Sequence, residues 1–119
     1  MGEALKHQVG GQHYKGLACQ VVELAVMADL NSFQFNIIKY VMRHPEKNGI
    51  EDVKKALHYA RLAQELKPIN HANMKGLLAF CALNKIEHNI AMMFYDVIEQ
   101  NWDNVAQAIE ELLKDLTTL

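Results

Sequence analysis

The sequence predicts an all-α protein, a compact bundle of five to six helices preceded by a flexible N-terminal arm. Apolar residues recur at helical spacing through most of the 119 residues. No alternation of apolar and polar residues continues for more than a few positions, which argues against strands. The hydrophobic fraction of 50% is enough for a buried core. A chain this small leaves much surface uncovered, so we also expect self-association.

The first half of the chain divides into an arm and three helices. Residues 1–16 are polar and contain adjacent glycines, which predicts a flexible arm. Asn31 and Ser32 can each cap a helix, because a short polar side chain accepts a bond from a free N–H group at a helix start. Pro45 and Pro68 mark where helices cannot continue. We therefore expect helices over residues 18–30, 32–43 and 50–66.

The second half predicts three further helices, over residues 70–84 and 88–100 and from residue 102 onward. Apolar residues in the last helix repeat with 3, 4, 3, 4 spacing, namely Trp102, Val105, Ile109, Leu112 and Leu116. This pattern is typical of a coiled-coil seam, although it is under three heptads long. It fits either packing inside one chain or a seam between identical chains, so the C-terminal helices are also the expected oligomer interface.

Charge divides the chain into an arm (1–16), a three-helix unit (17–67) and an acidic helical extension (68–119). Bases outnumber acids by two up to Lys67, and acids outnumber bases by four after it. An anionic ligand therefore belongs with the first half, although a solvated surface also explains the asymmetry. The net charge of −2 argues against a protein that coats nucleic acid.

The two cysteines, Cys19 and Cys81, lie far apart in apolar contexts, which indicates free thiols in a reducing compartment. The chain opens without the apolar segment of a signal peptide. No apolar run approaches the ~20 residues that a membrane span requires. We expect a cytoplasmic protein without a membrane segment.

Several standard catalytic sites are absent from the sequence. It contains neither a phosphate-binding G-x-x-x-x-G-K-[ST] loop nor a G-x-G-x-x-G turn. Zinc-binding C-x-x-C and H-E-x-x-H patterns are missing as well, and no resident metal is predicted. The paired E-x-x-E signature of all-α nucleotide pyrophosphohydrolases is also missing.

Cations and aromatic side chains are predicted to gather across the second and third helices. Residues at positions i, i+3, i+4 and i+7 share one helix face. On the second helix these are Asn36, Lys39, Tyr40 and Arg43, and on the third they are Asp52, Lys55 and Tyr59. Such a face suits a phosphorylated, ring-bearing ligand. An Arg binds phosphate bidentately, Lys side chains such as Lys47 add point charges, and tyrosines stack on a base.

Each of these residues also has an ordinary structural interpretation. The Lys and Arg side chains fit a solvated helix surface, and the tyrosines fit the edge of a core. Glu51 and Asp52 lie in a first helical turn, where acids interact favourably with the helix dipole. From the residues alone, both interpretations stay open.

A family resemblance favours the ligand site. It rests on His13, Tyr14, Phe35, Asn36, Lys39, Tyr40, Arg43, Lys47, Asn48, Gly49, Glu51, Asp52, Lys55, Ala56 and Tyr59. In order and spacing these residues resemble a family of small phage proteins that includes a P-loop-lacking nucleotide kinase of podoviruses. The resemblance covers residues 11–66 and implies a phage-encoded protein in the host cytoplasm that binds a nucleotide or a nucleotide-like phosphate ester.

As an enzyme, such a protein would resemble a deoxynucleoside monophosphate kinase. Arg43, Lys39 and Lys55 would neutralise the transferred charge, since phosphoryl transfer depends mainly on positioning and electrostatics. Asp52 or Glu51 would orient the acceptor hydroxyl or hold Mg²⁺. Tyr40 and Asn36 would hold the base, and His13 with Tyr14 would close over the site.

Two other functions compete with this hypothesis. The same pocket could sequester a nucleotide signal of host defence without turning it over. Alternatively, the acidic second half could bind a host factor. Catalysis requires a carboxylate at the phosphate-binding face, whereas sequestration requires only cations and stacking. Because Asp52 shares a predicted face with Lys55 and Tyr59, the pattern mildly favours an enzyme.

Overall fold

Six α-helices and no strands are found in the residues that the computed structural model describes, 19–45 and 49–118. The helices are α2 (Val21–Ala28), α3 (Ser32–Arg43), α4 (Ile50–Leu66), α5 (Leu77–Leu83), α6 (His88–Glu99) and α7 (Trp102–Thr117). The predicted all-α bundle is therefore confirmed. The predicted arm, with His13 and Tyr14, and the loop residue Lys47 lie outside the described residues.

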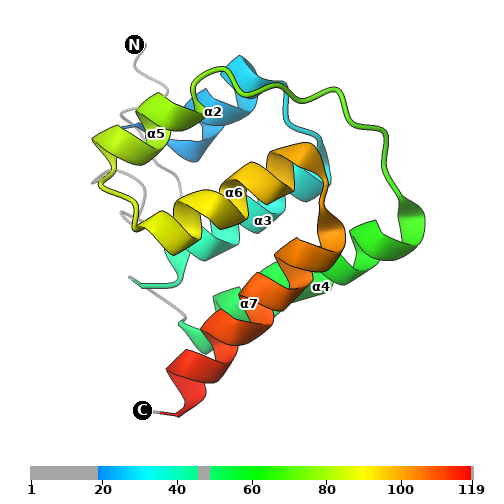
Figure 1. The fold of residues 1–119 in the computed structure, drawn as a ribbon, viewed down its shortest axis with the longest axis vertical. Coiled ribbons are helices and arrows are strands. Elements are labelled where there is room, and N and C mark those ends of the chain that lie inside the picture. Colours follow the sequence, from blue (N-terminus) through cyan, green and yellow to red (C-terminus); the bar gives the residue numbers. More distant parts are fainter. Residues whose placement is uncertain (1–18, 46–48, 119) are drawn as a thin grey trace.

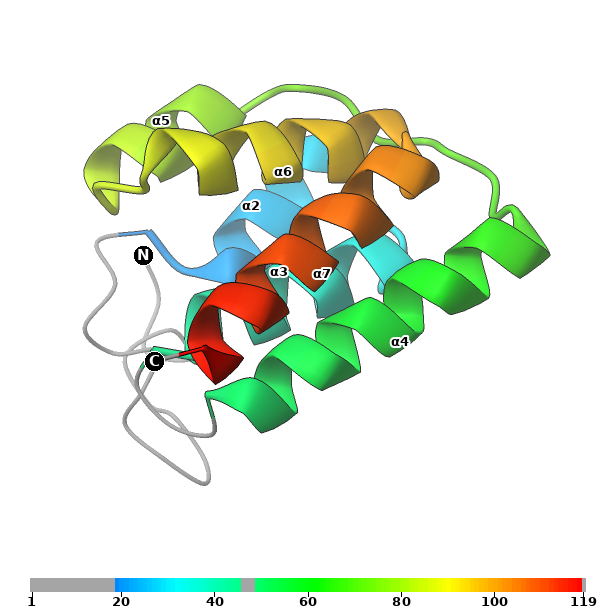
Figure 2. The same cartoon turned by 60° about the horizontal axis from the view of Figure 1, so that its bottom comes forward.

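The helices form two layers of three (Figures 1 and 2). One layer contains α2, α3 and α4, and the other contains α5, α6 and α7. Each helix of the second layer contacts its counterpart in the first, so that α5 lies on α2, α6 on α3 and α7 on α4. The fully buried side chains at this boundary come from both halves of the chain and include Leu24, Ile37, Val53, Phe80, Phe94 and Ile109. The two halves therefore share one core.

The start of α3 follows from its capping residues. The Asn31 side chain accepts a 2.9 Å bond from the backbone N–H of Gln34. In return, the Gln34 side chain accepts a 2.9 Å bond from the backbone N–H of Asn31. This reciprocal pair is a capping box, which satisfies two backbone donors that a helix start otherwise leaves open. Of the two predicted caps, Asn31 is the one used.

The helix predicted over residues 70–84 is wrong in its first half, because α5 begins only at Leu77. Asn70 explains the difference. Its side chain donates a 2.8 Å bond to the Ile98 carbonyl and accepts a 2.9 Å bond from the Ala72 N–H. The local bond from Ala72 competes with helix formation, and the bond to Ile98 ties Asn70 to α6. Gly76, with a φ of 82°, then turns the chain into α5 in a conformation that glycine adopts readily.

The predicted seam of α7 packs inside the chain. Trp102, Val105 and Ile109 are buried, and Leu112 and Leu116 pack against the same core. The helix contacts α4 and α6. Of the two interpretations of the 3, 4, 3, 4 pattern, packing within one chain accounts for these five side chains.

Candidate functional site

Two tyrosines and two lysines predicted to share a ligand site meet across α3 and α4. The Tyr40 and Tyr59 rings stack, with centroids 6.1 Å apart and planes 17° from parallel. Lys39 Nζ lies 4.7 Å from the Tyr40 ring centroid, and Lys55 Nζ lies 5.4 Å from the same centroid on the α4 side. Both distances are within the range of cation–π attraction, so the aromatic pair holds two positive charges near it.

A hollow of about 440 Å³ opens beside this cluster. We name it the α3–α4 hollow and define it by its lining residues, which are Tyr40, Glu51, Lys54, Lys55, His58, Tyr59 and Leu62. Its wall is thus part aromatic and part cationic, with one carboxylate. This combination can accept a phosphate on the lysines and a ring against the tyrosines.

Arg43 and Asp52 pair with each other and do not line the hollow. Arg43 Nε lies 3.5 Å from Asp52 Oδ2, and the Asp52 side chain is 0% exposed against 22% for Arg43. Neither Asp52 oxygen nor Arg43 Nε has a hydrogen-bond partner among the described residues. The pair is therefore a buried charge pair that joins the end of α3 to the first turn of α4.

The buried position of Asp52 changes the predicted arrangement of carboxylates. The sequence places Asp52 on one face with Lys55 and Tyr59, but Asp52 is buried while Lys55 is exposed. The carboxylate that reaches the α3–α4 hollow is Glu51. Glu51 and Asp52 are adjacent in α4, so their side chains point about 100° apart around the helix axis.

Among the described residues, no contact joins the Asn36 side chain to the Tyr40–Tyr59 pair. Its side-chain amide donates a 2.8 Å bond to the Ser32 carbonyl, one turn earlier in α3. This bond uses one of the two amide N–H groups and leaves the other N–H and the side-chain oxygen available to a ligand.

Three residues of the hollow, Lys54, His58 and Leu62, were not identified from the sequence as site residues. The His58 ring lies 6.3 Å from that of Tyr59, in an edge-on arrangement. The sequence does contain a signal for them, because Glu51, Lys54, Lys55, His58 and Leu62 occupy positions i, i+3, i+4, i+7 and i+11 and so share one helix face.

Metal-binding and thiol chemistry have little basis in the part of the chain that the structure describes. No three His, Cys, Asp or Glu side chains gather there in a way that could hold a metal ion. Cys19 and Cys81 are free thiols, the first buried and the second half-buried. Burial raises the pKa of both thiols, and the Glu23 charge adds to the effect at Cys19. Both thiols are therefore weak nucleophiles near neutral pH.

Comparison with known proteins places a domain of unknown function over the first half of the chain. A DUF3310 domain, described as "Protein of unknown function (DUF3310)", is found at residues 10–61. This range contains α2, α3 and most of α4, and so the Tyr40–Tyr59 pair. No curated protein and no solved structure matches the chain. None of the helices in the described residues is long and apolar enough to cross a membrane.

Proposed function

We propose that the protein binds a nucleotide or a nucleotide-like phosphate ester in the α3–α4 hollow. The observation that carries this proposal is the stacked Tyr40–Tyr59 pair with lysines beside it. Lys54 and Lys55 line the hollow and would bind the phosphate, while Tyr59 would contact the base or sugar. The family resemblance supports the same ligand class and a phage origin.

Binding without turnover is the form of this function that the geometry favours. Arg43 and Asp52, two of the residues expected to act in catalysis, compensate each other's charge inside the protein. The remaining site has lysines, aromatic rings and one exposed carboxylate, Glu51, and its lysines and rings are sufficient for sequestration of a nucleotide. The biological role we propose is capture of a nucleotide signal made by the host.

A deoxynucleoside monophosphate kinase is the second candidate, and Glu51 is the observation in its favour. Its carboxylate lines the same hollow as Lys54 and Lys55. It would orient the acceptor hydroxyl or contribute to Mg²⁺ binding, with the other metal ligands supplied by phosphates and water. Asp52 is fully buried and takes no part in this version of the mechanism.

Self-association through the second half of the chain is a further part of the proposal. Because the α7 seam is occupied within the chain, the exposed apolar side chains on the helices of the second half lie mainly on α5 and α6. Leu78 is 83% exposed there, and Met92 and Tyr95 are 47% and 42% exposed. Light scattering tests this point, and we expect a mass above that of the 13.5 kDa monomer.

The test of the proposed function is calorimetric titration of the purified protein with nucleoside mono-, di- and triphosphates and with cyclic nucleotides. Each mixture is then followed by phosphorus NMR for transfer of a phosphoryl group. Saturable binding with unchanged ligand supports sequestration, and transfer from a triphosphate to a monophosphate supports the kinase. Absence of binding for every nucleotide would overturn both and leave the host-factor hypothesis.

A further inference from the structure

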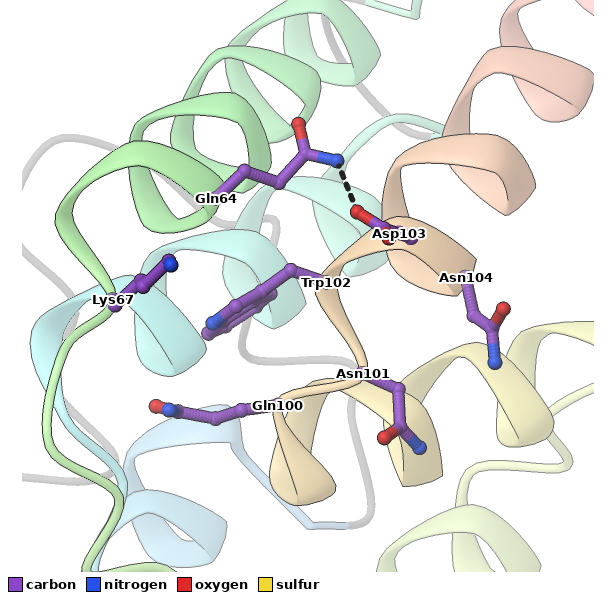
Figure 3. Close-up of a pocket in the computed structure, with 7 residues that line it drawn as sticks. All are labelled: Gln64, Lys67, Gln100, Asn101, Trp102, Asp103 and Asn104. Carbon is purple, nitrogen blue, oxygen red and sulfur yellow. Dashed lines mark hydrogen bonds between the residues drawn. The ribbon is translucent and has the colours of Figure 1, made fainter.

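Trp102 has a buried polar atom that the rest of the described chain does not satisfy. Its side chain is 8% exposed, and its Nε1 has no hydrogen-bond partner there. Leaving a buried donor unpaired costs about 1–3 kcal/mol, so an indole N–H normally has an acceptor. In Figure 3 the indole nitrogen is turned toward the ends of the Lys67 and Gln100 side chains. Because the nitrogen is buried, an acceptor atom satisfies it by entering between those two side chains.

The space in front of Trp102 is a hollow of about 410 Å³, which we name the α4–α7 hollow. It lies between the last turn of α4, with Gln64 and Lys67, and the residues that lead into α7, Gln100 to Asn104 (Figure 3). It shares no residue with the α3–α4 hollow. A ligand there would be separate from the proposed nucleotide.

The start of α7 faces the same hollow and favours negative charge. The Asn101 side chain does not cap the helix and instead donates a 2.9 Å bond to Asp96. The first backbone N–H groups of a helix have no partner inside it and carry a partial positive charge. In this 16-residue helix those groups belong to residues that line the hollow.

The charged side chains limit the ligand to a monoanion. Lys67 is the only cationic residue among the described residues that line the hollow. Asp103 lies opposite, where its Oδ1 accepts a 2.9 Å bond from Gln64. Gln100 is held in place by a 2.7 Å bond to the Pro68 carbonyl and a 2.9 Å bond from Asn31. A ligand in this hollow would meet one lysine, one indole N–H and one helix start, with a carboxylate nearby. These groups suit a ligand with one negative charge better than a ligand with two.

We propose that the α4–α7 hollow binds a small molecule through a carboxylate group. One carboxylate oxygen accepts the Trp102 N–H, and the Lys67 ammonium neutralises the charge. The indole N–H resonance can report binding without overlap from another indole, because Trp102 is the only tryptophan in the chain.

The experiment is a titration of the ¹⁵N-labelled protein with sodium acetate at constant ionic strength, followed through the indole N–H resonance of Trp102. We expect a saturable shift of that resonance and of the Asn104 amide. Sodium chloride gives no saturable shift, and inorganic phosphate at pH 8, mostly a dianion, binds at least about threefold more weakly. Acetate shifts that stay linear, or equal those of chloride, would overturn the proposal, and so would tighter binding of phosphate.

Two lysine variants complete the test. Lys67→Met should weaken acetate binding about three- to tenfold, because it removes a partly solvated charge from the ligand. Lys85→Met is the matched control, since Lys85 has nearly the same left-handed backbone conformation, with φ of 54° against 49°, and does not line the hollow. We expect it to bind acetate as the unchanged protein does. Equal loss in both variants would contradict a site at Lys67. Nucleotide binding at the α3–α4 hollow is measured separately, so either site can fail alone.

Discussion

Two sets of charged side chains lie where α3 meets α4, and the two sets have different surroundings. The Arg43–Asp52 pair lies inside the protein, with Asp52 fully buried. The Lys39 and Lys55 ammonium groups instead lie over the Tyr40 ring, beside an open hollow. All four charged residues lie within the DUF3310 domain at residues 10–61. This part of the chain therefore contains one charged pair buried between the helices and two lysines that remain accessible.

The largest expected effect comes from breaking the buried pair. Arg43→Met leaves the Asp52 carboxylate buried and without its partner, which should lower the free energy of unfolding by about 3–5 kcal/mol. Asp52→Asn should cost less, about 1–2 kcal/mol, because Arg43 is 22% exposed and can turn toward water. Urea unfolding followed by circular dichroism measures both.

An exposed ion pair provides the control for Arg43. Arg61 Nη2 lies 2.9 Å from Glu110 Oε1, and the two side chains are 57% and 52% exposed. Arg61→Met should cost only about 0–1 kcal/mol, although its ion pair is shorter, because solvent screens exposed charges. Equal losses for the two Arg variants would contradict a structural role that depends on burial.

The next effect concerns the accessible lysines. Lys55→Met should weaken nucleotide binding about five- to tenfold, which corresponds to the loss of one charge-assisted phosphate bond at a solvated site. The free energy of unfolding of Lys55→Met should change by less than about 0.5 kcal/mol, because the Lys55 side chain is exposed. Lys75→Met, at an exposed position outside the hollow, is the control and should bind normally. Calorimetric titration measures each affinity.

The smallest effect belongs to the aromatic pair. Tyr59→Leu removes the ring that stacks on Tyr40 and that contacts Phe33 edge-on at 6.5 Å. We expect a loss of about 0.5–1.5 kcal/mol in the free energy of unfolding. Tyr59→Phe keeps the ring and should be nearly neutral. If the Phe variant loses as much as the Leu variant, the hydroxyl rather than the stacking is the stabilising group.

The helices could be predicted from the sequence because their ends carry local signals. Asn31 and the prolines mark those ends, and α4 begins and ends at the predicted residues. The segment before α5 could not be predicted, because Asn70 accepts a bond from Gln34 and donates one to the Ile98 carbonyl, and both partners are distant in the sequence. A local pattern does not show such partners.

Part of the candidate site could be predicted, because residues at helical spacing share one helix face. The Tyr40–Tyr59 pair and Lys55 follow from helical spacing, and the structure brings them together. The different surroundings of Glu51 and Asp52 could not be predicted, because they depend on how α4 is rotated against α3. Burial of Asp52 is set by that rotation, and it decides which acid a ligand would meet.

The most direct test of the central claim compares nucleotide affinity in Arg43→Met and Lys55→Met, measured by calorimetry at a temperature where both variants are folded. We predict that Lys55→Met loses about five- to tenfold in affinity, as the loss of one exposed charge–phosphate bond would give. We predict that Arg43→Met, although much less stable, binds the same nucleotide as tightly as the unchanged protein does. Loss of affinity in Arg43→Met with normal binding by Lys55→Met would contradict the account.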